Sequence, residues 1–175
     1  DGCPSDPACT IVIVKPRPVT VAANNGPVCL GATLKLTATP VVGGTYSWTG
    51  PNGFTSTQQN PEIPNATPAN AGAYCVTATL DGVTSLPSCT NAVVNDPPAV
   101  SITASKNPLC GTETATLCGP DNAGFDYLWS PGGQTTACIT TGTAGTYTLK
   151  VTDRRTGCSN TASIKLEVRP APPCK

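Results

Sequence analysis

The amino-acid sequence predicts an all-β chain of two tandem antiparallel β-sandwiches, held by disulfides and preceded by an unpaired N-terminal strand. Three observations predict this. The 175 residues include 17 glycines, 19 prolines and 10 cysteines, a composition that excludes a helical protein. Short runs rich in Thr, Val, Ile and Leu alternate in polarity between turn residues, and no run has a period of 3.6 residues. The same series of strand-like runs also occurs twice along the chain.

The repeat predicts the domain boundaries. Residues 19–94 contain VTVAANNGPVCLGATLKLTA, YSW, AGAYCVTATLDG and SCTNAVV, and residues 100–168 contain VSITASKNPLCGTETATLC, YLW, AGTYTLKVTDRRTG and CSNTASIKLEV. About seven strands in roughly 75 residues per copy fit a sandwich better than a barrel. We predict an N-terminal extension at 1–18, a first module at 19–96 and a second module with a short C-terminal tail at 97–175. A semi-rigid proline joint at 95–98 connects the modules.

The N-terminal extension matches the end of each module. CTIVIVKPRP from Cys9 aligns with CTNAVVNDPP from Cys89: a cysteine, an apolar strand and a proline joint. An isolated apolar strand cannot bury itself. We therefore predict that this segment is a strand donated to the sheet of a neighbouring subunit, or else the end of a preceding module. The strand residues are Thr10, Ile11, Val12, Ile13 and Val14.

The repeated pattern P-x-C, a strand containing T-L, Y-x-W and A-G-x-Y resembles tandem immunoglobulin-like or PKD-like modules. Such modules occur in large secreted bacterial surface proteins, particularly those of Bacteroidota. The resemblance covers nearly the whole chain. It implies that Trp48 and Trp129 lie in the cores, together with Tyr74 and Tyr147. It also implies a scaffold or adhesive role rather than catalysis, and it does not specify a ligand.

Alignment of the two copies predicts two disulfides, and side-chain alternation predicts a third. Cysteines at matching positions of the repeat give the pairs Cys29–Cys89 and Cys110–Cys158. Each would close a loop of about 50 to 60 residues and contribute about 4 kcal/mol in the chain-entropy model. Outward-facing positions on neighbouring strands give the pair Cys118–Cys138.

Four cysteines then remain: Cys3, Cys9, Cys75 and Cys174. They could form two further local bridges, with Cys3–Cys9 as one of them. Alternatively, Cys3 or Cys9 bonds to Cys75 or Cys174 of the next subunit and locks a head-to-tail polymer covalently.

The sequence has few residues suited to catalysis or metal binding. The chain has no histidine, so Ser/His/Asp and Cys/His catalysis are excluded, and its ten acids are scattered without a metal-binding motif. We expect no cofactor and no metal, and consider the chain not to be an enzyme. Ten acids balance ten bases, which argues against nucleic acid, and no apolar run is long enough for membrane insertion. Asn65 begins an N-x-T sequon, a candidate glycosylation site.

Ten cysteines indicate an extracellular or cell-surface location. We predict a structural subunit of an extracellular filament or surface assembly. Its partners would be copies of itself, joined head to tail by the N-terminal strand and by interchain disulfides. The alternative is an adhesin or ligand-binding fragment of a larger repeat protein, with surface glycans or proteins as partners.

Overall fold

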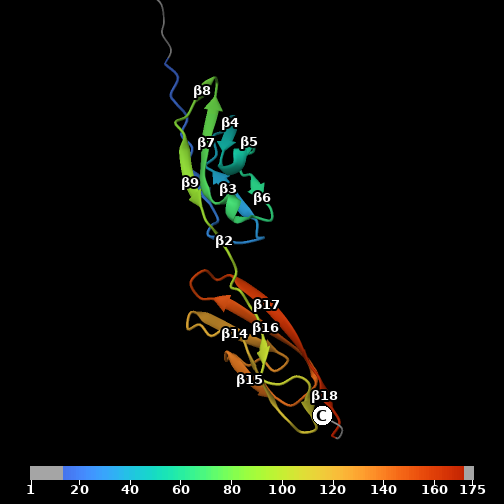
Figure 1. The fold of residues 1–175 in the computed structure, drawn as a ribbon. Coiled ribbons are helices and arrows are strands. Elements are labelled where there is room, and N and C mark those ends of the chain that lie inside the picture. The colour runs from blue at the N-terminus through green and yellow to red at the C-terminus, as the bar shows by residue number, and fades with distance from the viewer. Residues whose placement is uncertain (1–13, 172–175) are drawn as a thin grey trace, which may run out of the picture. The chain divides into compact units, whose positions relative to one another are not determined.

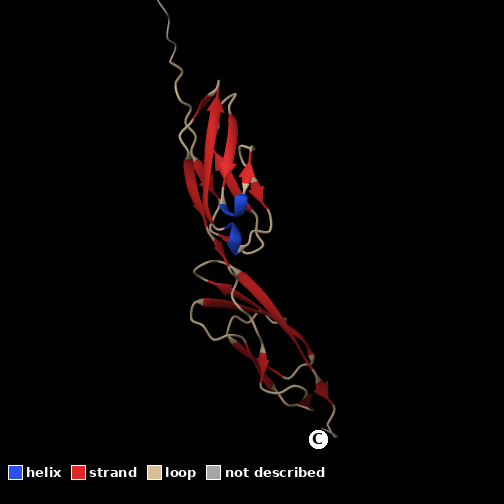
Figure 2. Cartoon of the chain, turned by 45° about the horizontal axis from the view of Figure 1, so that its top comes forward, coloured by secondary structure: helices blue, strands red, loops and turns tan. Residues whose placement is uncertain are grey.

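The structure is a computed structural model, and it describes residues 14–171. Strands dominate the described chain, with two 3-10 turns, η1 (Pro51–Gly53) and η2 (Pro68–Asn70), as its helical segments (Figure 2). The predicted all-β class is confirmed.

The described chain divides into two compact units. Unit 1 takes the described residues up to Asn24, together with Lys35–Glu62 and Gly72–Asn91; unit 2 takes Asn25–Leu34, Ile63–Ala71 and the described residues from Ala92 onward. Unit 2 therefore includes short segments of the first sequence repeat. The predicted module boundaries at 18/19 and 96/97 stay a prediction.

Unit 1 contains two sheets. One has the order β1-β3-β6; the other has the order β5-β4-β7-β8, with β9 also paired to β7, and β7 and β9 lie side by side in Figure 1. The strands are β1 (Ala22–Asn24), β3 (Leu34–Ala38), β4 (Thr45–Thr49), β5 (Thr55–Ser56), β6 (Glu62–Ile63), β7 (Gly72–Leu80), β8 (Val83–Thr84) and β9 (Ser88–Ala92).

Unit 2 repeats this plan with the orders β11-β13-β15 and β14-β16-β17, and it adds two short parallel pairs, β2 with β10 and β12 with β18. The strands are β2 (Val28–Cys29), β10 (Val94–Asn95), β11 (Thr103–Ala104), β12 (Leu109–Cys110), β13 (Ala115–Cys118), β14 (Phe125–Ser130), β15 (Cys138–Thr141), β16 (Gly145–Asp153), β17 (Ser159–Leu166) and β18 (Val168–Arg169).

The strand order in both copies is that of an immunoglobulin-like sandwich, with strands A-B-E in one sheet and C-F-G in the other. The period-two burial pattern explains why these sequences form strands. In β3, Leu34, Leu36 and Ala38 are buried and the residues between them are exposed. The predicted immunoglobulin-like sandwich fold is confirmed.

The predicted aromatic cores are also confirmed. Trp48, Trp129 and Tyr74 are essentially inaccessible, and Tyr147 is 6% exposed. Each indole N–H finds a carbonyl: Trp48 Nε1 donates to Gln59 at 3.3 Å, and Trp129 Nε1 donates to Thr136 at 2.9 Å. A buried Trp without such a partner would lose the energy of hydrating its N–H group, so these bonds allow full burial of the rings.

Candidate functional site

Three disulfides join six of the described cysteines within one chain. The pairs are Cys29–Cys158, Cys75–Cys89 and Cys118–Cys138, with Cα separations of 5.6, 4.0 and 4.1 Å. The last is the cross-strand pair that side-chain alternation predicts, and the register of β13 with β15 places its two residues opposite each other. Cys110 is disulfide-bonded as well.

The predicted pairs Cys29–Cys89 and Cys110–Cys158 are wrong, because Cys89 and Cys158 do not occupy equivalent positions in the two copies. Cys89 bonds across to Cys75, which follows the core residue Tyr74. In the second copy the residue after the core tyrosine is Thr148, and it lies opposite Ser163. Ser163 is therefore the equivalent of Cys89, and Cys158 lies five residues earlier, in the turn between β16 and β17.

The alternation of side chains in β2 also explains why Cys29 pairs with Cys158. Val28 is buried in the sandwich, so the alternation within β2 turns Cys29 away from that core. It reaches Cys158, which is 1% exposed.

Of the four candidate interchain cysteines, the described residues include Cys75. Cys75 is bonded to Cys89 in the same chain, so its assignment as an interchain link is wrong. It points out of its sheet, as predicted, but Cys89 on the neighbouring strand does too. Cys3, Cys9 and Cys174 lie outside the described residues, as do Thr10, Ile11, Val12 and Ile13 of the donor strand; their roles stay predictions. Val14 is described, has no strand pairing and is 84% exposed.

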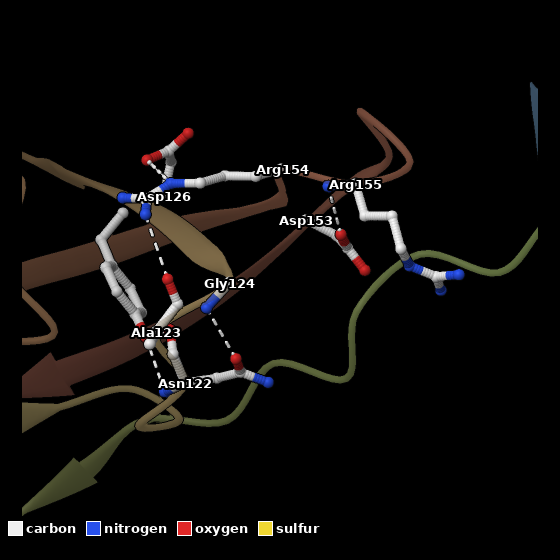
Figure 3. A network of polar contacts seen from close by, with 8 residues as sticks. Asn122, Ala123, Gly124, Asp126, Asp153, Arg154 and Arg155 are labelled. Carbon is white, nitrogen blue, oxygen red and sulfur yellow. Dashed lines mark hydrogen bonds and ion pairs between the residues drawn. The ribbon is translucent and has the colours of Figure 1, made fainter.

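A network of charged side chains lies where the loop before β14 meets the β16–β17 turn (Figure 3). Arg154 connects the two loops: its Nε donates to Asp126 Oδ1 at 2.7 Å and its Nη1 donates to the Ala123 carbonyl at 3.0 Å. Asp153 organises the turn, because its Oδ1 accepts the N–H groups of Arg155 and Thr156 at 2.8 and 3.3 Å. Both loops are thereby held in one conformation.

The same end of the sandwich carries a hollow of about 490 Å³. Its lining combines Phe125 with the charged turn, and the Arg155 side chain extends away from the Arg154–Asp126 pair (Figure 3). Within residues 14–171 the Arg155 guanidinium has neither a hydrogen bond nor an ion pair. This arrangement could accept a carboxylate or another anion. The predictions from sequence treated these acids as scattered and gave the two arginines no role; the D-R-R-T-G turn was the signal that could have identified them.

A second polar arrangement fixes the end of β12. Glu113 Oε1 accepts a hydrogen bond from Lys106 Nζ, and its Oε2 accepts the Cys110 N–H at 2.8 Å. The hydrogen bond from Lys106, followed by that from Cys110, lowers the pKa of the Glu113 carboxyl below its ordinary value. The carboxylate therefore stays ionised through the neutral range and holds the turn after β12.

Unit 1 has an apolar groove of about 220 Å³ between residues 17–20 and 85–88. Val19 and Leu86 on its walls are 78% and 67% exposed. Five of the eight large apolar side chains that are exposed in the described chain belong to unit 1: Val14, Val19, Val21, Val42 and Leu86. Of these five, Val19 and Leu86 line the groove, and an exposed apolar groove is typical of an interaction surface.

The remaining aromatic residues are not arranged as stacking platforms for sugars. Phe54 is half-buried and packs edge-on against Tyr74, with 5.3 Å between the ring centroids. Phe125 packs against the core of unit 2. Tyr46 and Tyr127 use their hydroxyls alike, each accepting a backbone N–H in the loop that precedes its own strand, from Val41 at 2.7 Å and Asn122 at 3.1 Å.

The candidate glycosylation site lies on the surface. Asn65 is exposed in a left-handed turn (φ 53°), and Thr67, the third residue of the sequon, is exposed too. Ala66 between them is buried and exchanges backbone hydrogen bonds with the loop after β2. The Asn65 side chain is thus accessible, while the backbone on which it sits is held in place.

Residues 14–171 have neither a metal-binding cluster nor a membrane-spanning helix. These residues contain no group of three or more His, Cys, Asp or Glu side chains able to hold a metal ion. Nor does any described helix have the length and apolar character required to cross a bilayer.

No protein-family model matches the chain, and no curated protein matches it. Its similarity to solved structures is remote. Murine CEACAM1b has 14% identity and a TM-score of 0.43 over 86% of this chain and 100% of that chain. Three N-terminal domains of the bacteriophage RB49 outer capsid protein Hoc have 22% identity and a TM-score of 0.43, over 85% of this chain and 58% of that chain. The N-terminal eight immunoglobulin domains of Down syndrome cell adhesion molecule have 15% identity and a TM-score of 0.48, over 87% of this chain and 25% of that chain. These identities concern the fold alone.

Proposed function

We propose that the chain is a non-catalytic structural subunit of an extracellular filament or surface assembly. Copies of it join head to tail through the N-terminal segment, which adds as a strand to the sheet edge of a neighbour. The bacterial surface-protein resemblance and the extracellular location belong to this proposal. Disulfides persist in oxidising compartments, which supports that location.

The observation that carries the proposal is the Cys29–Cys158 disulfide. It joins two residues separated by 129 positions, one from each sequence repeat. When the chain ends are pulled, the tension passes through the covalent bond between these two residues. The residues between them in the sequence then bear no tension. The intervening strands then cannot be extended until the bond is reduced. This property suits a subunit that transmits force along an assembly.

The described sheets indicate where an added strand would lie. Both long central strands already have their last-strand partners, β9 on β7 and β17 on β16, so neither sandwich lacks this strand. The donated strand must therefore extend an edge. β17 is an eight-residue edge strand of its sheet, with mostly exposed polar side chains, and it is the acceptor we propose.

Polymerisation of the purified, oxidised chain tests the proposal. We expect fibres in negative-stain electron microscopy and a sedimentation coefficient that rises with concentration. The double variant Ile11→Asp, Ile13→Asp should stay monomeric, because charged side chains cannot be buried against a neighbouring sheet without a partner. The control Thr10→Ser, Val12→Thr keeps strand propensity and should polymerise. A wild-type chain that stays monomeric at every concentration would contradict the proposal.

The alternative function, an adhesin or ligand-binding fragment, is favoured by the hollow beside Arg155. A binding surface on the loops should recognise an acidic glycan or protein through this guanidinium. Binding to a panel of sialylated, sulfated and neutral glycans tests it. The adhesin function is supported if binding to an acidic glycan is lost in Arg155→Ala and kept in Lys150→Ala, a basic residue in the middle of β16.

A further inference from the structure

We infer that β17 accepts the donated strand over one short stretch, residues 161–165, and that its occupant is residues 10–14 of a second copy of this chain. The inference rests on the proposed head-to-tail function and names the backbone groups that the two strands share. Residues 161–165 are called the acceptor stretch below. Its limits follow from the hydrogen bonds along the unpaired side of β17.

The unpaired side of β17 carries the backbone groups of its odd-numbered residues. The Lys165 carbonyl accepts a hydrogen bond from Asn107 Nδ2 at 2.8 Å, and the Glu167 N–H donates to Asn107 Oδ1 at 3.0 Å. Asn107 leads into β12, which pairs with β18, so these backbone groups point away from β16. The even-numbered residues of β17 point the other way and pair with β16.

The pairing of β17 with β16 agrees with this direction. Ser163 lies opposite Thr148, and their hydroxyl oxygens are 2.8 Å apart. Side chains approach most closely in those opposite pairs that exchange no backbone hydrogen bonds. The N–H and carbonyl of Ser163 therefore point to the unpaired side, and those of Thr161 follow the same alternation.

Two asparagines limit the acceptor stretch. At its start, Asn160 Oδ1 accepts the Thr161 N–H at 2.9 Å. At its end, Asn107 Nδ2 binds the Lys165 carbonyl. Between these points, the Thr161 carbonyl, both backbone groups of Ser163 and the Lys165 N–H have no partner within residues 14–171. These four groups can bond to the backbone of one added strand.

The equivalent edge of unit 1 is protected. Cys89 is the equivalent of Ser163, so Pro87 is the equivalent of Thr161. Proline has no N–H group, and proteins place it on edge strands to prevent pairing with another strand. The strand of unit 1 is also interrupted there, between β8 and β9, whereas β17 continues without a break. Unit 2 therefore has the edge that is suited to strand addition.

Residues 10–14 match the acceptor stretch in length and in chemistry. Both segments have five residues, so in extended form they are equally long. Val14, at the described end of the donor, has no strand pairing in its own chain and is 84% exposed. Ile11 and Ile13 lie on one face of an extended strand. That face can cover Ile164, which is half-buried against the core of unit 2.

The variant Ser163→Pro tests the central bond. It removes an N–H that points away from β16, so the bonds between β16 and β17 remain and the variant should fold. Ser163→Ala is the matched control, because it loses the same hydroxyl contact with Thr148 and keeps the N–H. Assembly of Ser163→Pro should require concentrations roughly tenfold above those of Ser163→Ala, as expected when a backbone acceptor of the donated strand loses its partner.

Amide hydrogen exchange of the wild type gives a second measurement, which decides even where Ser163→Pro fails to fold. Fibres and monomer are exchanged in D2O, dissolved and compared residue by residue by NMR. The N–H groups of Ser163 and Lys165 should exchange roughly tenfold or more slowly in the fibres. The Ser159 N–H is on the same side of β17 but precedes Asn160, so its exchange should be the same in both.

The outcomes separate this inference from the proposed function. If fibres form while Ser163 and Lys165 gain no protection, or Ser163→Pro assembles like Ser163→Ala, the donated strand adds at another edge and the acceptor stretch is wrong. If Ile11→Asp, Ile13→Asp still forms fibres, another segment is the occupant, and both the inference and the proposed function are overturned. A wild-type chain that stays monomeric at every concentration also overturns both.

Discussion

Position 50 requires glycine because the Tyr74 ring lies against it, and not because of its backbone conformation. Its φ of −166° is extended backbone that any residue adopts. A Cβ at this position, however, would lie 2.4 Å from Cδ1 of the buried Tyr74. Gly119 has the corresponding role in unit 2, where a Cβ would lie 2.3 Å from Cδ2 of Leu149. Each glycine lets a loop cross directly over a core side chain.

The first prediction therefore concerns Gly50→Ala. The added methyl must displace a buried ring, so we expect a loss of about 1 to 3 kcal/mol in unfolding free energy, measured by urea denaturation. Gly145→Ala is the control, because a Cβ there meets nothing within 4 Å. Equal stability of the two variants would show that Tyr74 adjusts without cost.

The second prediction concerns the pH dependence of Glu113. Since its pKa is lowered in the folded chain, by Lys106 first and then by the Cys110 N–H, the stabilisation it provides is present above the carboxyl's ordinary pKa of about 4.5. That stabilisation is lost as the pH falls through the folded value. The difference in urea midpoint between the wild type and Glu113→Gln should accordingly shrink between pH 6 and pH 3. A difference that stays constant across this range would contradict the ion-pair role.

At the scale of the strands, the two sandwiches link their last two strands by different chemistry. The outer face of the β7–β9 pair carries the Cys75–Cys89 disulfide. At the equivalent place on β16 and β17, Thr148 Oγ1 and Ser163 Oγ are hydrogen-bonded at 2.8 Å. Both pairs tie the last two strands together, one covalently and one by hydroxyls.

This equivalence gives the third prediction. The double variant Thr148→Cys, Ser163→Cys should oxidise spontaneously, because the residues lie directly opposite each other, and it should stabilise unit 2 by about 3 kcal/mol for a 15-residue loop in the chain-entropy model. Thiol titration and thermal unfolding with and without reductant would measure both effects. The converse variant, Cys75→Thr with Cys89→Ser, should lose a similar amount. Two free thiols in the first variant under oxidising conditions would refute the equivalence.

At the scale of the whole molecule, the Cys29–Cys158 bond decides which residues respond to force. The repeat alone implies two separately unfolding modules. The disulfide encloses the residues between positions 29 and 158, which include most strands of both repeats. The covalent structure therefore defines the mechanical unit, and it differs from the sequence repeat.

Single-molecule extension supplies the fourth prediction. Pulled from its ends under oxidising conditions, the chain should never release the residues between Cys29 and Cys158. In the variant Cys29→Ser, Cys158→Ser the contour length at full extension should be greater by up to about 330 Å, at roughly 3.5 Å per residue, because the Cys75–Cys89 and Cys118–Cys138 disulfides still exclude 14 and 20 of the 129 residues. The variant Cys118→Ser, Cys138→Ser should give no such gain, because this disulfide lies inside the enclosed segment. Equal contour lengths for wild type and the first variant would exclude the force-bypass role.

Features that depend on local chemistry could be predicted from the sequence. The period-two pattern of β3 and β7 and the Y-x-W and A-G-x-Y motifs sufficed for strands, sandwiches and the cores around Trp48 and Trp129. Even one disulfide, Cys118–Cys138, followed from which way neighbouring side chains point. These features repeat over a few residues, so the side-chain period alone contains them.

Contacts between residues far apart in the chain could not be predicted in this way, because folding brings them together. A slip of five positions in aligning Cys158 was enough to predict two wrong disulfides, because pairing depends on the register of strands far apart in the chain and not on the order of cysteines. The Arg154–Asp126 network and the exposed Leu86 groove were missed for the same reason. Each is formed by two segments brought together by folding, and neither segment alone differs from an ordinary turn.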